Sequence, residues 1–142
     1  MFHATITHIF LITALGCAAS ATAAAADLTV VVAGLKNDEG SVRVGLFHDP
    51  KSFPKTFSVG QAVAAKADAV SVTFKDLAPG NYAVSAYQDL NGNQKLDTNF
   101  VGKPTEPNGF SRNARSTFGP PSFTDAQIEL ADTNQNLTIQ VK

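Results

Sequence analysis

Apolar and polar residues alternate along much of this chain, and this alternation constrains the fold more than any other feature. Successive side chains of a β-strand point to opposite faces, so a period of two predicts strands with one buried face. The pattern occupies residues 28–33, 42–46, 70–74, 82–86, 126–130 and 137–141. Short turn-rich segments separate most of these runs. The sequence therefore predicts an all-β protein, a single antiparallel β-sandwich of immunoglobulin-like or transthyretin-like type with about seven strands.

Two turn sequences indicate how these strands are joined. Ala78-Pro79-Gly80-Asn81 combines a fixed φ at proline with a glycine that tolerates positive φ, which is typical of a tight turn between strands. Residues 132–136 are Asp-Thr-Asn-Gln-Asn, and they predict a second hairpin near the end of the chain. The alanine-rich segment 61–68 is the one candidate for a short helix.

The alternation stops over a long segment near 98–122. This segment contains Phe100, Phe110 and Phe118, which a disordered polar linker does not need. Loops of this length in a compact domain are usually ordered or functional. We expect an ordered loop whose phenylalanines cap the core, and the alternative is a lid over a bound ligand.

The first 26 residues have the features of a secretory signal peptide. They contain no Lys, Arg, Asp or Glu, and the apolar run from Ile9 to Ala19 is too short to span a bilayer. The prediction is a signal peptide over 1–26 and a single domain over 27–142, exported to the periplasm or the extracellular space, with no transmembrane segment in the mature chain. Lipid anchoring through Cys17, the only cysteine, is the less favoured alternative.

The charge composition limits the classes of partner. The net charge is −1, and Lys and Arg form no cluster along the sequence. Such a balance gives no long-range field to attract nucleic acid or an anionic surface, so we expect no nucleic-acid partner.

Residues 89–100 contain oxygen-bearing side chains at the spacing of a calcium loop. Such a loop places ligands at positions 1, 3, 5, 7 and 9 and a bidentate carboxylate at 12. The candidate ligands are Asp89, Asn91, Asn93, the backbone carbonyl of Lys95, and Asp97. Position 6, normally Gly, is Gln94, and position 12 is Phe100, so we expect Glu106 to supply the missing carboxylate.

The predicted calcium site is weak, with a dissociation constant of roughly 0.1 to 1 mM. The alternative interpretation of the same residues needs no metal. Asn91-Gly92 is a favoured dipeptide for a two-residue hairpin turn, and flanking Asn and Asp side chains bond their own backbone in such turns.

The segments 87–99, 102–106 and 109–111 together resemble a bacterial family of exported domains of unknown function. The family pattern is close to H-D-x-N-G-N-G-K-L-D-T-N followed by G-x-P-x-E-G-x-G-F-S-N. Gln88 stands in place of the family's His, and Gln94 stands in place of its Gly. The resemblance covers essentially the whole predicted mature chain. It implies a prealbumin-like sandwich and carries no established activity.

We therefore expect an exported, non-enzymatic binding or structural module of the cell envelope, with an unknown ligand or envelope partner and with the calcium loop as its candidate site. The alternative is a small periplasmic hydrolase that uses loop carboxylates such as Asp97 and Glu106, whose spatial separation the sequence does not give. Nucleophilic catalysis is disfavoured because no Gly-x-Ser-x-Gly motif accompanies His48.

Overall fold

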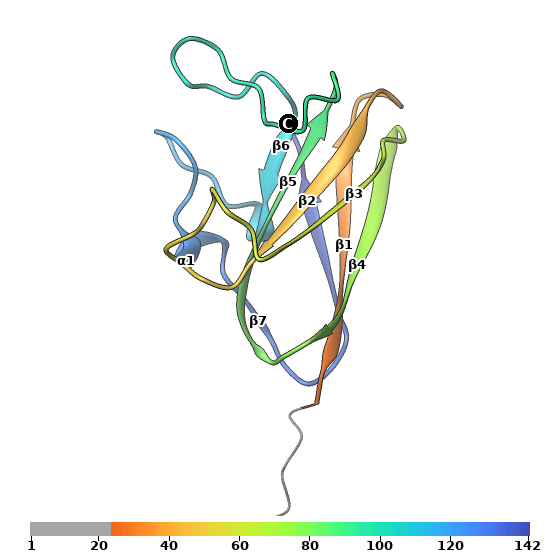
Figure 1. Cartoon of the computed structure of the whole chain (residues 1–142), viewed down its shortest axis with the longest axis vertical. Helices are drawn as coiled ribbons and strands as arrows, with labels where there is room; N and C mark the ends of the chain where they lie inside the picture. The colour runs from red at the N-terminus through yellow and green to blue at the C-terminus, as the bar shows by residue number, and fades with distance from the viewer. Residues whose placement is uncertain (1–23) are drawn as a thin grey trace, which may run out of the picture.

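Eight strands form two facing sheets in this computed structural model, which describes residues 24–142 (Figure 1). The first sheet has the order β4-β1-β8, with β1 at Ala26–Leu35, β4 at Asp68–Leu77 and β8 at Gln135–Gln140. The second has the order β3-β2-β5-β6, and β7 pairs with β5 as well. Its strands are β2 (Ser41–Phe47), β3 (Val59–Ala64), β5 (Gly80–Asp89), β6 (Asn108–Phe110) and β7 (Ile128–Leu130). The predicted all-β sandwich is confirmed.

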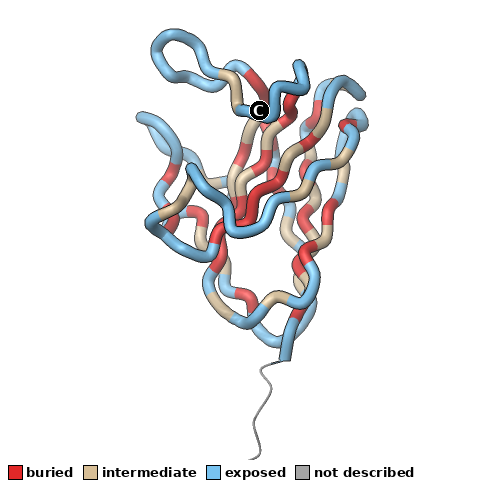
Figure 2. The backbone as a smooth tube through the Cα atoms, in the orientation of Figure 1, coloured by how far each residue is buried: buried red, intermediate tan, exposed pale blue. Residues whose placement is uncertain are grey.

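The core lies between the sheets and is built by the alternating residues. In β1, Leu28, Val30 and Val32 are fully buried, and Val42 and Leu46 of β2 face them from the other sheet. Figure 2 shows this burial along the strands, with the connecting loops exposed. Among the described residues, the strands and both hydrophobic clusters lie within residues 26–142, so this part of the chain contains the two sheets and the core between them.

A smaller aromatic cluster fixes the loop after β2. Phe53 contacts Phe47, Phe110 and Phe123 with ring centroids 5.0, 5.7 and 5.8 Å away. Phe123 begins the short helix α1 (Phe123–Ala126), which starts with a capping box between Ser122 and the third helical residue. The cluster therefore holds the 48–58 loop and α1 beside the second sheet.

Neither predicted turn sequence, 78–81 or 132–136, joins two strands into a hairpin, because the strands on either side of each turn lie in different sheets. The Pro79-Gly80 turn carries the chain from β4 in the first sheet to β5 in the second, and the turn after β7 carries it back to β8. β8 then pairs with β1 in parallel, whereas every other strand pair is antiparallel. Turn residues specify a local reversal of direction, but strand partners are chosen by which apolar faces meet in the core.

Two segments adopt other structures than expected. The first half of the helix candidate 61–68 belongs to strand β3, because Gln61 and Val63 alternate inward and the backbone pairs with β2 from Val59 to Ala64. Cross-strand pairing outweighs the helical propensity of alanine here. The strand expected over 126–130 is shorter, since α1 includes Ala126 and β7 begins at Ile128.

The long segment near 98–122 is ordered, as expected, but it is not a plain loop. It contains β6 and a 3-10 turn, η1 (Ser111–Asn113). Only Phe110 of its three phenylalanines packs against a core cluster. Phe100 and Phe118 are 100% and 90% exposed, so the prediction that they cap the core is wrong.

No helix among residues 24–142 has both the length and the hydrophobicity needed to cross a bilayer. The predicted signal peptide, residues 1–26, lies outside the described residues except for Ala24 to Ala26. The alternative lipidation site, Cys17, also lies outside them.

Candidate functional site

The predicted calcium loop lies in the connection between β5 and β6. Asn91-Gly92 does not form a two-residue turn between paired strands, because β5 pairs with β6, which begins only at Asn108. Residues 97–105 instead fold back on themselves, and we call them the projecting hairpin. Asp97 and Thr105 are joined by a 2.9 Å backbone hydrogen bond, as are Asn99 and Lys103.

Asp89, the last residue of β5, is completely buried. Its Oδ2 lies 2.9 Å from Nε of Arg43 and accepts the backbone N–H of Gln94, also at 2.9 Å. Burial raises the pKa of the Asp89 carboxyl, but the hydrogen bonds from Arg43 and Gln94 outweigh burial and hold the pKa below its ordinary value. Asp89 Oδ1 has no hydrogen-bond partner among the described residues.

Gln94 adopts a left-handed backbone conformation, with φ of 68°. This is the sixth position of the predicted calcium loop, where glycine is usual because it tolerates positive φ. The chain thus reaches the conformation of such a loop with a glutamine, and the N–H that this conformation directs to Asp89 offsets part of the strain.

Glu106, the candidate for the missing carboxylate, folds back onto the loop, where it binds backbone groups. Its side chain is 5% exposed. Oε1 accepts the N–H of Leu90 at 2.9 Å, and Oε2 accepts the N–H of Asp97 at 3.0 Å. One carboxylate therefore ties together both ends of the turn that follows β5.

The remaining predicted ligands lie in the same turn. Asp97 accepts hydrogen bonds from the side-chain amides of Asn91 at 2.6 Å and Asn93 at 2.7 Å. Asn93 Oδ1 accepts the N–H of Lys95 at 2.9 Å. All six predicted site residues are thus brought into one loop, yet residues 24–142 contain no group of three or more His, Cys, Asp or Glu side chains placed to hold a metal. Calcium binding stays a prediction.

Two residues of the neighbouring strands also bear on this loop: sequence reasoning missed Arg43, and it noted Gln88 without its contacts. Arg43 is the ion-pair partner of Asp89, and it lies on β2 across the sheet. Gln88, at the position of the family's His, is fully buried, with Nε2 2.9 Å from both Asn37 Oδ1 and the Glu39 carbonyl. The register of β2 against β5 brings Arg43 close, and no local sequence pattern reveals that register.

A groove crosses the outer face of the second sheet beside this loop. Two pockets, of about 520 and 920 Å³, share Pro54, Ser85, Tyr87 and Leu96 and so form one continuous depression, which we call the basic groove. Three loops border it: residues 48–58, the projecting hairpin, and residues 114–121. All three lie on the left side of the sandwich in Figure 1.

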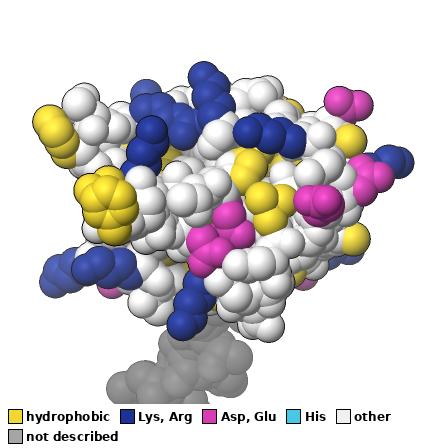
Figure 3. Space-filling view, turned by 90° about the horizontal axis from the view of Figure 1, so that it is seen from above, with side chains coloured by type: hydrophobic (Ala, Val, Ile, Leu, Met, Phe, Trp, Pro, Cys, Tyr) yellow, Lys and Arg dark blue, Asp and Glu magenta, His cyan; other side chains and the backbone are white. Residues whose placement is uncertain are grey.

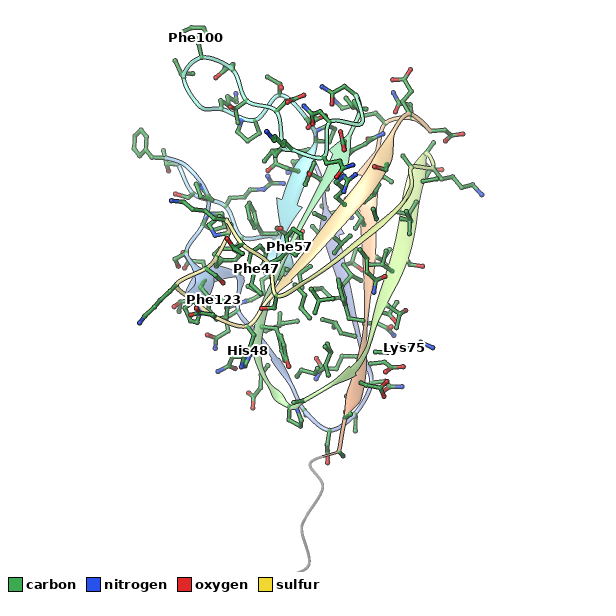
Figure 4. The ribbon with its side chains drawn as sticks, in the orientation of Figure 1. Phe47, His48, Phe57, Lys75, Phe100 and Phe123 are labelled. Atoms are coloured by element: carbon green, nitrogen blue, oxygen red, sulfur yellow. The ribbon has the colours of Figure 1, made fainter. Side chains whose placement is uncertain are left out.

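The floor of the groove is flat because small residues align across the strands. Gly45 of β2 is paired with Gly60 of β3 and with Ser85 of β5. The ring of Phe57 lies over the two glycines, as its place beside β2 and β3 in Figure 4 indicates. A Cβ at Gly60 would come within 2.5 Å of Cε2 of Phe57, so glycine is required for this contact. The Phe57 ring remains 55% exposed as an apolar wall.

The groove concentrates positive charge. Its lining includes six of the eleven Lys and Arg residues of the chain: Arg43, Lys55, Lys95, Lys103, Arg115 and Lys142. All twelve Asp and Glu residues lie in the described part of the chain, and none of them lines either pocket. These cations come from separate segments, so they form a cluster in the folded chain although they form none along the sequence.

The hydrolase alternative finds no support in the geometry. Neither Asp97 nor Glu106 lines the groove, and both oxygens of Glu106 accept backbone N–H groups. His48 lies toward the opposite end of the sandwich (Figure 4), with Nδ1 3.1 Å from the Asn81 carbonyl and its ring against Tyr82. Among the described residues, no carboxylate side chain lines either of the two pockets that form the groove.

Comparison with known proteins gives one match. No curated protein and no solved structure matches the chain significantly. Residues 30–138 match the family described as uncharacterised proteins conserved in bacteria. The match begins in β1 and ends in β8, so it spans both sheets, the Asp89 loop and nearly all of the basic groove. The chain therefore belongs to this bacterial family, DUF2141.

Proposed function

We propose that this protein is an exported, non-catalytic binding module of the cell envelope, whose basic groove holds an anionic ligand with an apolar part. One observation carries the proposal: six cationic side chains and no acidic ones line a groove whose floor and walls are largely small or apolar. Asp89 offsets the charge of Arg43, so the positive charge of the lining comes from the other five cations, and a positively charged depression concentrates anions.

Arg43 is a ready anion ligand within this groove. Its Nε is occupied by Asp89, which fixes the guanidinium, and the side chain is 29% exposed. Its two terminal nitrogens make no hydrogen bond to any other residue in 24–142. An oriented guanidinium with free donors loses little conformational entropy when an oxyanion binds.

Tyr87 provides a neutral donor beside Arg43. The two residues are directly paired across β2 and β5, and both line the groove. Burial raises the pKa of the Tyr87 hydroxyl, and the nearby carboxylates of Asp89 and Glu106 raise it further against the opposing effect of Arg43. The hydroxyl therefore keeps its proton at neutral pH and can donate to an anion.

The groove is tested by titrating residues 24–142, labelled for amide NMR, with monomeric dihexanoyl phosphatidylglycerol. We expect shift changes confined to β2, β3, β5 and the bordering loops, with the zwitterionic dihexanoyl phosphatidylcholine binding about fivefold more weakly. Lys95→Ser should weaken binding about two- to fivefold, because it removes one exposed cation. Gly60→Ala should also weaken it, since the new methyl displaces the Phe57 ring.

Lys75→Ser is the matched control, because Lys75 is an exposed lysine of β4 in the opposite sheet (Figure 4) and lines neither pocket. It should leave the affinity unchanged. Equal binding of the two lipids, or shift changes centred on β1, β4 and β8, would contradict the proposed function.

Calcium binding by the Asp89 loop is a second candidate function. Two observations favour it: Gln94 takes the backbone conformation of the sixth loop position, and the buried Asp89 Oδ1 lacks a hydrogen-bond partner in residues 24–142. Calcium accepts amide and backbone carbonyl oxygens beside carboxylates, and the loop offers these at Asn91, Asn93 and Lys95. The side chains of Asn91 and Asn93 would have to exchange their hydrogen bonds to Asp97 for the metal.

Thermal unfolding with chelator and then with millimolar calcium tests this candidate. At about ten times its dissociation constant, calcium should add about 1.4 kcal/mol to the free energy of unfolding and raise the midpoint by several degrees. Asp97→Asn should reduce the shift, whereas Asp132→Asn, in the distant turn after β7, should not. A midpoint that is the same with chelator and with calcium would rule the site out.

A further inference from the structure

We propose that the anionic ligand of the groove is the headgroup layer of an anionic phospholipid bilayer, on which the domain docks through the tips of two loops. This inference rests on the proposed function and names the partner of the same surface. The tips are Phe100 and Val101 in the projecting hairpin and Phe118 in the 114–121 loop.

These tips present large apolar side chains to water. Phe100 is 100% exposed, Phe118 is 90% exposed and Val101 is 69% exposed. Phe100 extends from the end of its loop, away from the sandwich (Figure 4). Burial of these three side chains at an interface would be favourable, because it would remove their apolar surface from water.

Both tips belong to one surface. Val101 and Phe118 line the same pocket, together with Gly109 of β6. Three cations, Lys103, Arg115 and Lys142, line that pocket, and Arg115 and Lys142 are hydrogen-bonded to Asn108 of β6. In the end-on view, apolar side chains lie at the left edge beside Lys and Arg, whereas most of the Asp and Glu groups in view lie toward the centre and right (Figure 3).

This order of groups matches the layers of a bilayer surface. Apolar side chains at an interface enter the boundary of headgroups and acyl chains, and Lys and Arg set slightly behind them meet the phosphates. A bilayer accepts protruding side chains without a complementary pocket. A protein partner would need a separate cavity for each tip, and protein interfaces usually centre their aromatic residues within a buried patch. The observations therefore favour a lipid surface.

Both loops are held in place before any contact. Backbone hydrogen bonds close the projecting hairpin at Asp97 and Asn99. Arg115 donates to the carbonyls of Asn108 at 3.3 Å and Gln140 at 3.1 Å, which ties the second loop to β6 and β8. The two loops therefore lose little conformational entropy when the domain docks on the bilayer.

Co-sedimentation of residues 24–142 with lipid vesicles tests the inference, because this part contains the two sheets and the core between them and lacks the apolar run at the start of the chain. Vesicles of phosphatidylcholine with about 30% phosphatidylglycerol should bind at least tenfold more tightly than phosphatidylcholine alone, and about 0.5 M salt should weaken binding. Phe100→Ser and Phe118→Ser should each reduce binding to anionic vesicles at least about tenfold, and Phe100→Leu should retain most of it.

Val59→Ser is the matched control, since Val59 is an exposed apolar residue of β3 that lies outside both loops and lines neither pocket. It should leave vesicle binding unchanged. The replaced side chains are exposed, and an unchanged thermal midpoint will show that each variant folds.

The outcomes separate the two proposals. Binding of soluble phosphatidylglycerol in the groove without any binding to anionic vesicles would overturn membrane docking and leave the proposed function standing. If neither soluble phosphatidylglycerol nor anionic vesicles bind, both the proposed function and the docking inference are overturned. Vesicle binding that ignores lipid charge, or that survives the double replacement of Phe100 and Phe118 by serine, would also overturn the docking inference.

Discussion

Replacing Glu106 with alanine is expected to lower the free energy of unfolding by about 2 to 3 kcal/mol. The Glu106 carboxylate is 5% exposed and accepts the backbone N–H groups of Leu90 and Asp97. Alanine removes both charge-assisted hydrogen bonds and leaves a cavity beneath the turn. In a domain of this size the thermal midpoint, followed by circular dichroism, should fall by roughly 10 °C.

Two further variants make this expectation specific. Glu106→Gln keeps one acceptor oxygen but sets an NH₂ group against the second N–H, so its midpoint should lie between those of the parent and Glu106→Ala. Glu129→Ala, at an exposed position of β7, should change the free energy of unfolding by no more than about 0.5 kcal/mol. If Glu106→Ala were as stable as Glu129→Ala, the carboxylate would not be what holds the loop.

Replacing Arg43 with leucine is expected to cost about 1 to 3 kcal/mol near neutral pH, because it leaves the buried Asp89 carboxylate without its ion-pair partner. The effect should depend on pH. In the parent, the pKa of Asp89 is held below its ordinary value of 3.8. The ion pair therefore contributes fully to the free energy of unfolding above that value. This contribution is lost as the pH falls through the lower pKa of the folded state. In Arg43→Leu, burial without the partner should raise that pKa, and protonation should relieve the unpaired charge.

Urea unfolding at about pH 7 and about pH 3 checks this expectation. The stability difference between parent and Arg43→Leu should be largest at the higher pH and should shrink at the lower one. Lys75→Leu, at an exposed lysine of β4 that makes no hydrogen bond through its side chain within residues 24–142, should show little difference at either pH. A cost for Arg43→Leu that is equal at both pH values would mean that the charge of Asp89 does not depend on Arg43.

The strands could be predicted because alternation is a local property. Leu28, Val30 and Val32 are apolar at every second residue, and burying that face is favourable whichever strand lies opposite. The partners could not be predicted in the same way. The residues after Leu130 specify a turn, but β8 completes the first sheet beside β1, a pairing that involves residues more than a hundred positions apart.

The basic groove was hidden from the sequence for a similar reason. A net charge of −1 and scattered lysines suggest no cationic surface. Lys55, Lys95 and Lys142 come from three distant segments, and only the packing of these segments around the second sheet collects them. Composition reports the sum of charges, whereas a field depends on their positions.

The strand pattern and the group of oxygen-bearing residues after β5 are encoded locally, because both follow from neighbours along the chain. The tertiary structure decided what those residues contact. Pairing of β2 with β5 brings Arg43 to Asp89, and the return of the chain toward β6 brings Glu106 to the N–H groups of Leu90 and Asp97. Buried carboxylates must find donors wherever the fold supplies them, and here the fold supplies them from segments distant in sequence.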